Sequence, residues 1–163
     1  MIYRANADAN GVIELFRLPI EGSVLSTRLS AALVAGGDVS SFAITSERAV
    51  YIADQRFNER IEIFSVPLAG GAAVSLDALP SFGDVLDFRI APGAAEVVFR
   101  ADRDTDQVLE LYRASIDGTT AALRVNGPLT PGGDVQDFAA LDELTFYRAD
   151  QSSDEVFELF ETR

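Results

Sequence analysis

The chain has 163 residues, of which 48% are hydrophobic and 24% charged, a composition typical of one globular domain rather than a disordered segment. Its formal net charge of −13 disfavours nucleic acid and anionic membranes as partners and favours cations and basic proteins. Cysteine, histidine and lysine are absent, which excludes disulfides, thiolate or imidazole metal sites, and the commonest catalytic bases and nucleophiles.

One segment is repeated four times along the chain. Its copies begin at Tyr3, Tyr51, Phe99 and Tyr147, so successive copies start 48 residues apart. A fixed period of roughly 40 to 50 residues is typical of propellers and solenoids. We therefore expect residues 1–163 to form a single piece of a repeat fold. The chain starts in the middle of a repeat, as a truncated or engineered piece would.

Each repeat divides into four segments with the pattern of β-strands, which we call A to D. In the third repeat, residues 83–92 are strand A, 95–102 strand B, 108–116 strand C and 119–129 strand D. A polar loop lies between strands B and C, and Asp117-Gly118 is a hairpin signal between C and D. The chain thus reads BCD, ABCD, ABCD, ABC, which predicts 14 antiparallel strands in three and a half units.

Alternation along the strands predicts which faces pack together. On strand B, an aromatic residue and an alanine two positions later share a face in every copy. On strand C, the predicted core positions are Leu15, Ile63, Leu111 and Leu159, together with Ile13, Ile61, Leu109 and Phe157. The pairing of large with small side chains suits sheets that stack face to face.

The motifs FRADRD with ELYRASIDG, YRADQ with ELF, and YRANA with ELF resemble the TolB-like branch of the WD-repeat β-propellers. This resemblance implies an all-β fold whose blades have four antiparallel strands, here a partial ring of about three and a half blades. Propellers of this family mostly bind proteins or sit beside a catalytic domain. The family implies a periplasmic or extracellular location, although the N-terminal residues do not have the pattern of a signal peptide.

A Gly-Asp-Val tripeptide opens strand A in three repeats, at residues 37–39, 83–85 and 133–135. In propellers of this type, the loops before strand A and after strand B lie on one rim. We therefore expect an acidic rim composed of Asp38, Asp84, Asp134, Asp102, Asp104, Asp106, Asp150 and Asp154.

The loops between strands B and C suggest one candidate metal site. Oxygen ligands at alternate positions of a tight loop can converge on calcium, which takes six to eight oxygens. The third copy offers Asp102, Asp104, Asp106 and Glu110, and the first copy offers Asn6, Asp8, Asn10 and Glu14. This spacing is similar to that of the calcium loops in integrin-type propellers. The fourth copy is weaker, and Arg56 interrupts the second.

The same residues have a structural interpretation. Asp and Asn cap turns by accepting hydrogen bonds from nearby backbone N–H groups. The glutamates can form cross-strand ion pairs instead of binding metal. A hairpin symmetric about Thr105 would place Glu110 opposite Arg100, and equivalent hairpins would pair Glu14 with Arg4 and Glu158 with Arg148.

The residue types favour a scaffold over an enzyme. Paired carboxylates could in principle hydrolyse glycosides, but these acids recur in every repeat, whereas a catalytic pair is usually unique. We expect a non-catalytic propeller module that binds proteins through its acidic rim, with a calcium-stiffened structural propeller as the alternative. Exposed sheet edges and faces invite association, so we also expect a homo-oligomer in which partial blades of different copies complete a ring.

Overall fold

The computed structural model describes residues 1–7, 11–19, 25–77, 83–93, 95–141 and 144–163. Within these ranges the chain contains β-strands and no helix, and therefore no helix able to cross a membrane. The described chain contains 14 strands in four antiparallel sheets with three, four, four and three strands, in the predicted order. The chain forms two compact units, Met1–Ser75 and Leu76–Arg163, and each contains two sheets.

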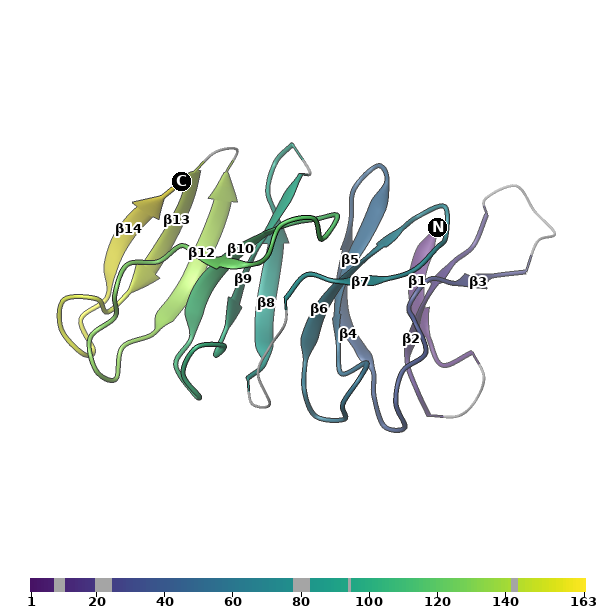
Figure 1. The fold of residues 1–163 in the computed structure, drawn as a ribbon, viewed down its shortest axis with the longest axis horizontal. Coiled ribbons are helices and arrows are strands. Elements are labelled where there is room, and N and C mark those ends of the chain that lie inside the picture. Colours follow the sequence, from purple (N-terminus) through teal and green to yellow (C-terminus); the bar gives the residue numbers. More distant parts are fainter. Residues whose placement is uncertain (8–10, 20–24, 78–82, 94, 142–143) are drawn as a thin grey trace. The chain divides into compact units, whose positions relative to one another are not determined.

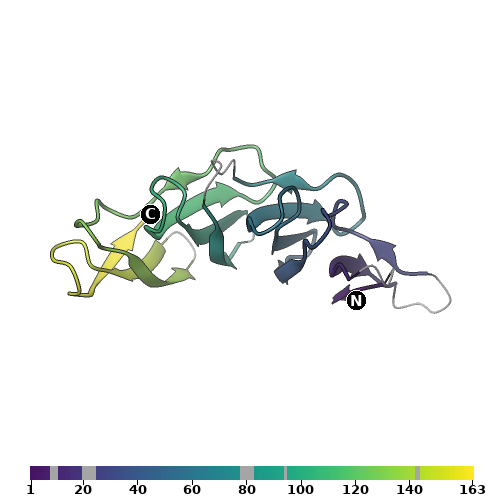
Figure 2. The same cartoon turned by 90° about the horizontal axis from the view of Figure 1, so that it is seen from below.

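The first unit contains sheets 1 and 2 (Figures 1 and 2). Sheet 1 has the order β1 (Ile2–Ala5), β2 (Glu14–Arg17) and β3 (Thr27–Arg28). Sheet 2 has the order β4 (Val39–Ile44), β5 (Arg48–Ala53), β6 (Glu62–Pro67) and β7 (Val74–Ser75). Consecutive strands pair in both sheets, so each sheet is a simple meander.

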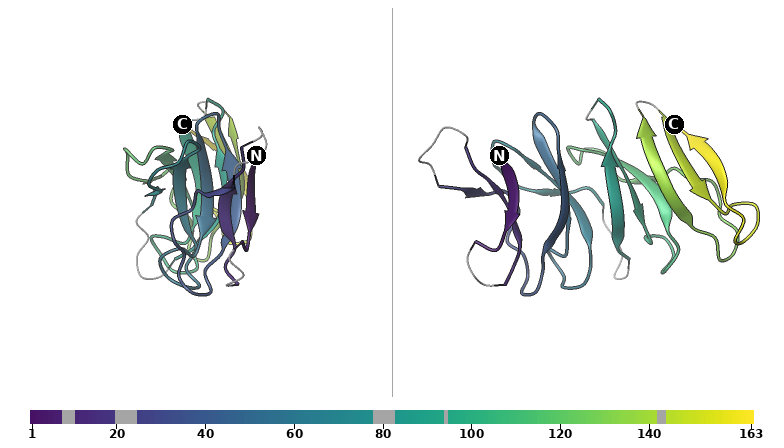
Figure 3. Two further views of the ribbon diagram at one scale, coloured as in Figure 1. Left: turned by 90° about the vertical axis from the view of Figure 1, so that its right-hand side faces the viewer. Right: turned by 180° about the vertical axis from the view of Figure 1, so that it is seen from behind.

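The second unit repeats this arrangement with sheets 3 and 4 (Figures 1 and 3). Sheet 3 has the order β8 (Val85–Ile90), β9 (Glu96–Ala101), β10 (Glu110–Ser115) and β11 (Leu123–Arg124). Sheet 4 has the order β12 (Val135–Leu141), β13 (Leu144–Ala149) and β14 (Glu158–Thr162). Strands A, B, C and D of the third repeat are therefore β8, β9, β10 and β11.

The fourth strand of sheet 3 is shorter than its sequence predicts. Residues 119–129 were expected to form strand D, but only Leu123 and Arg124 pair with β10. The preceding residues belong to the turn, because Asp117 accepts hydrogen bonds from the backbone N–H of Thr119 (3.0 Å) and from its hydroxyl (2.7 Å). These bonds hold the pKa of Asp117 below its ordinary value. A short outer strand exposes few unpaired backbone groups at the sheet edge.

Each sheet carries one stacked aromatic pair across its strands B and C. Ring centroids are 5.4–5.7 Å apart and the ring planes differ by 24–27°. The pairs are Tyr3–Phe16, Tyr51–Phe64, Phe99–Tyr112 and Tyr147–Phe160. Offset stacking of this kind adds about 0.5–1.5 kcal/mol to the area that the rings bury. We call the side of each sheet that bears this pair its aromatic face, and the opposite side its aliphatic face.

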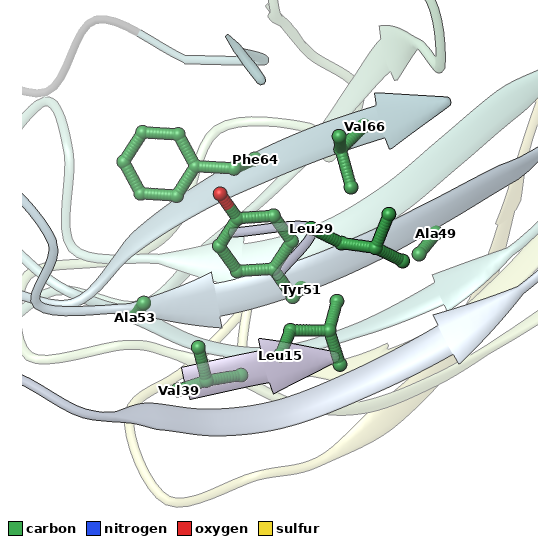
Figure 4. Close-up of a cluster of buried hydrophobic side chains, with 8 residues drawn as sticks. All are labelled: Leu15, Leu29, Val39, Ala49, Tyr51, Ala53, Phe64 and Val66. Carbon is green, nitrogen blue, oxygen red and sulfur yellow. The ribbon is translucent and has the colours of Figure 1, made fainter. Parts of the chain in front are cut away.

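Within each unit, the aliphatic face of the first sheet packs on the aromatic face of the second. In the first unit, Leu15 of β2 lies in one cluster with Tyr51, Ala53 and Phe64 of sheet 2 (Figure 4). In the second unit, Leu111 of β10 lies in the equivalent cluster with Tyr147, Ala149 and Val135. Each cluster thus combines a leucine of one sheet with an aromatic residue and an alanine of the next, as the pairing of large with small side chains predicts.

The predicted burial fails for three strand C positions, because Leu159, Phe157 and Ile13 are 73%, 41% and 37% exposed. Leu15, Ile63 and Leu111 are fully buried, but the equivalent Leu159 is 73% exposed. Leu159 lies on the aliphatic face of sheet 4, whose aromatic face is the side that packs on sheet 3. Alternation identifies the face on which a side chain lies, but the presence of a neighbouring sheet decides whether that face is covered.

The repeat supplies a matched pair of substitutions that measures this packing. We expect Leu111→Ala to lower the free energy of unfolding by about 2–5 kcal/mol, because it leaves a cavity between two sheets. Leu159→Ala in the isolated monomer should change it by less than about 0.5 kcal/mol, because the side chain is exposed. Denaturant unfolding of both variants at low protein concentration measures the difference, and equal losses would contradict the stacking described here.

Candidate functional site: the acidic rim

The first aspartate of each described loop between strands B and C joins two segments of its own sheet. One oxygen of Asp102 accepts the backbone N–H of Asp84 (2.5 Å), and the other accepts that of Gln107 (3.2 Å). Asp54 and Asp150 make the same two bonds, to Asp38 and Glu59 and to Asp134 and Glu155. These bonds confirm that the Gly-Asp-Val segment and the B–C loop meet on one rim of each of the three sheets.

The second of these bonds fixes an unusual backbone conformation. Glu59, Gln107 and Glu155 have φ values of 61–62°, and Gly11 at the same repeat position has φ 82°. A non-glycine residue costs roughly 1–2 kcal/mol in the left-handed region. The aspartate offsets part of this cost by accepting the N–H of the strained residue.

Each residue of the Gly-Asp-Val tripeptide has a separate role, as the third copy of the motif shows. A Cβ on Gly133 would lie 2.5 Å from the carbonyl oxygen of Asp150, so the close approach of the two chains requires glycine. The side chain of Asp134 accepts the backbone N–H of Leu109 in the preceding sheet (2.6 Å). The N–H of Val135 donates to the carbonyl of the same Leu109 (2.8 Å).

The first unit contains the same link between its two sheets. Asp38 accepts the N–H of Ile13 (2.5 Å), and the N–H of Val39 donates to the Ile13 carbonyl (2.8 Å). The aspartate of the tripeptide is therefore a structural tie from one sheet to the previous one. One oxygen of its carboxylate is therefore already engaged by a backbone N–H group.

An arginine on strand B forms a second link between sheets. It binds the following sheet, whereas the aspartate of the tripeptide binds the preceding one. Strand A has a β-bulge in all three sheets that possess it, between Val39 and Ser41 in sheet 2 and at the equivalent places in β8 and β12. In each unit the guanidinium of one arginine donates to the two carbonyl groups at the bulge of the following sheet. Arg4 contacts Val39 and Ser40, and Arg100 contacts Val135 and Gln136.

The glutamate that begins strand C does not lie opposite its predicted arginine, although Glu14 and Glu110 form salt bridges with other residues. Ala101 lies opposite Glu110, and Leu111 lies opposite Arg100, so the expected register is wrong by one residue. The same correction applies to Glu14 with Arg4 and to Glu158 with Arg148.

The observed partners of Glu110 and Glu14 come from strand D. Arg124 lies 2.7 Å from Glu110, and Arg28 lies 2.7 Å from Glu14, a spacing of 14 residues in each case. Sequence reasoning missed both arginines, although the shared spacing in two repeats was a visible signal.

The buried tyrosine of sheet 3 completes this network. The Tyr112 hydroxyl donates to the second oxygen of Glu110 (2.9 Å). Burial and the adjacent Glu110 carboxylate raise the pKa of Tyr112 well above its ordinary value. Tyr51 is likewise buried, which raises its pKa, and its hydroxyl donates to Gln55 (2.6 Å). Both phenols are therefore neutral structural donors rather than proton-transfer groups at neutral pH.

The proposed calcium ligands do not converge on a common point where the structure describes them. Both oxygens of Asp102 accept backbone N–H groups, and both oxygens of Glu110 have partners. Asp104 lies 3.9 Å from Arg124, and Asp106 is exposed. Asn6 is exposed and Glu14 pairs with Arg28, while Asp8 and Asn10 lie outside the described residues. The described residues contain no group of three acidic side chains that could hold a metal ion.

The aspartate tie can be tested by mutation within a single loop. We expect Asp102→Ala to lower the free energy of unfolding by about 2–3 kcal/mol, because it leaves two backbone N–H groups without a charged acceptor. Asp106→Ala is the matched control and should change it by less than about 0.5 kcal/mol. Urea denaturation measures both values, and equal effects would show that the Asp102 bonds contribute nothing specific.

Calcium binding by these loops stays a prediction, and thermal unfolding tests it. A metal that binds only the folded state must raise the melting temperature. Since the Asp102 and Glu110 oxygens have protein partners, we expect no more than a marginal shift with millimolar calcium. A rise of several degrees that Asp106→Ala abolishes would instead support a metal site that includes the exposed part of the loop.

Comparisons with known proteins locate the fold but give no family. No family model matches the sequence, and no curated protein matches it. A structure from a study of two prolyl endopeptidases is similar over 94% of this chain, with 15% identity and a TM-score of 0.60. This chain spans 23% of that endopeptidase chain.

A putative TolB from Agrobacterium tumefaciens aligns over 93% of this chain and 74% of its own length, with 13% identity. Its TM-score of 0.29 is too low to carry an argument. The similarity to the endopeptidase structure and the four antiparallel sheets described above agree with a propeller-type fold. The interpretation of these sheets as three and a half blades of a ring stays a prediction.

Proposed function

We propose that the protein is a non-catalytic propeller-type scaffold that associates with further copies of itself. The observation that carries this proposal is the contrast between equivalent positions of the repeat. Leu15 and Leu111 are fully buried under the next sheet of their unit, whereas Leu159 is 73% exposed on the same face of sheet 4. A face that the repeat is built to bury is an association surface when it is open.

The chemistry of the rim supports a scaffold rather than an enzyme. General acid–base catalysis needs a titratable group that can reach substrate and exchange a proton near neutral pH. Asp102 and Glu110 instead hold backbone N–H groups, an arginine and a tyrosine. The absence of histidine, cysteine and lysine removes the other common nucleophiles and bases. A carboxylate-based glycosidase is therefore the weaker hypothesis.

The acidic rim is the surface that we propose for contacts with other proteins. Asp104 and Asp106 project from the loop of sheet 3 and are exposed, and the whole chain carries a net charge of −13. Electrostatic complementarity to a basic partner raises association rates and opposes acidic competitors. Calcium-stiffened loops are the alternative role for the same residues, and the melting experiment above separates the two.

Self-association has a direct test in the mass of the species in solution. The monomer has a mass of 17.5 kDa, and static light scattering should give a weight-average mass that rises with concentration into the high micromolar range. The apolar faces should keep associating in high salt, which screens charge but not apolar burial. A constant monomer mass at every concentration would overturn the proposed self-assembly.

A further inference from the structure

We propose that the aliphatic face of sheet 4 is a docking surface for the aromatic face of sheet 1 of a second copy, in a head-to-tail contact. This inference rests on the proposed self-association and names the two surfaces that meet. The aliphatic face exposes the large side chains Leu141, Arg148, Phe157 and Leu159, together with Asp137, Ala139 and Glu161. The aromatic face of sheet 1 carries Tyr3, Ala5 and Phe16.

The strongest argument is that both units contain this contact already. In each unit a strand C leucine of one sheet lies in the same core cluster as the strand B aromatic residue and alanine of the next. Leu15 clusters with Tyr51 and Ala53, and Leu111 clusters with Tyr147 and Ala149. Since Leu159 occupies the same repeat position, the surface that fits it is an aromatic face with an alanine beside the ring.

Sheet 1 presents that complementary surface in an open state. Tyr3 and Ala5 are half-buried, whereas the equivalent Tyr51 and Ala53 are fully buried. The aromatic faces of sheets 2 and 4 pack within the cores of their units, whereas β1 is an edge strand of sheet 1. In the described part of the chain, sheet 1 therefore presents an open aromatic face and sheet 4 an open aliphatic face, and these two faces complement each other.

Arg148 gives the docking surface a polar part. Its equivalents Arg4 and Arg100 reach across to carbonyl groups of the following sheet. The Arg100 side chain is 11% exposed, but Arg148 is 51% exposed and pairs with Asp137 (2.7 Å) above the Phe157 ring. In the docked pair its guanidinium would lie beside the edge strand β1, where carbonyl groups lack a strand partner.

The contact that we infer is heterologous, with different surfaces on the two copies. An isologous contact would place two Leu159 side chains and two Arg148 guanidinium groups against each other around a twofold axis. Neither described unit contains a contact between two aliphatic faces. Heterologous contacts generate rings or open chains, so the assembly need not stop at a dimer.

The absence of cysteine in the chain makes disulfide trapping a clean test of this pairing. Ala5→Cys and Leu159→Cys would be made as separate variants, mixed, and oxidised under mild conditions. The pair corresponds to Ala53 with Leu15 and to Ala149 with Leu111, which share core clusters. We expect a disulfide-linked heterodimer to form at least ten times faster than in a mixture of Ala5→Cys with Leu123→Cys. Leu123 is a matched control, since it is 68% exposed on β11.

A second variant tests the same surface without a disulfide. Leu159→Asp should return the light-scattering mass to that of the monomer and leave the melting temperature of the dilute protein unchanged, while Leu123→Asp should keep the mass of the parent protein. Rapid homodimer formation by Leu159→Cys alone would show an isologous contact and overturn the head-to-tail pairing. If the protein associates but forms neither the Ala5→Cys–Leu159→Cys heterodimer nor the Leu159→Cys homodimer, the head-to-tail pairing is wrong and the proposed self-assembly stands. A protein that stays monomeric in light scattering would overturn both.

Discussion

The contact between the aliphatic face of one sheet and the aromatic face of the next is the interaction on which the rest of the structure depends. A meander of three or four short strands is marginal by itself, because it buries only one side of its residues. Burying one leucine or phenylalanine contributes about 1.5–3 kcal/mol. Leu15 and Leu111 contribute this free energy only because a second sheet covers them, with Tyr51 in the first unit and Tyr147 in the second. The sheet formed by one repeat is therefore stabilised by packing on the sheet formed by the next repeat.

Apolar packing alone does not fix the register between two stacked sheets. The hydrogen bonds between neighbouring sheets at the rim fix it. Asp134 and Val135 together bind the N–H and the carbonyl of a single residue, Leu109, in the preceding sheet. Arg100 binds two carbonyl groups at the bulge of the following strand A. These directional bonds specify one register between the sheets, which leucine and aromatic contacts would tolerate in several.

Much of this architecture can be predicted from sequence because the repeat supplies independent copies of each signal. The 48-residue period, the strand order and the shared rim all follow from comparing copies. The register of the B–C hairpin could not be predicted, because it depends on the backbone of one loop residue. Gln107 adopts a positive φ that shifts the pairing by one residue, and only Gly11 in the first copy indicates it. The exposure of Leu159 depends on which sheet lies beside it, and strand alternation does not contain that information.

The second sheet shows why the glutamate of strand C is structural. The residue 14 positions after Glu62 is Leu76 rather than arginine, so strand D cannot supply the counter-ion found in sheets 1 and 3. Arg56 of the B–C loop takes that place and donates to Glu62 with its Nε (3.0 Å), assisted by Arg60 (3.2 Å).

A buried carboxylate without a cation is costly, and Glu62 is fully buried. The arginine that seemed to interrupt a metal loop is therefore the partner that this burial requires. The same requirement is met by strand D in sheets 1 and 3 and by the B–C loop in sheet 2. The hydrogen-bonded acids of the rim, such as Asp38, Asp102 and Asp134, are thus a polar framework for the stacked sheets, while Asp104 and Asp106 stay exposed.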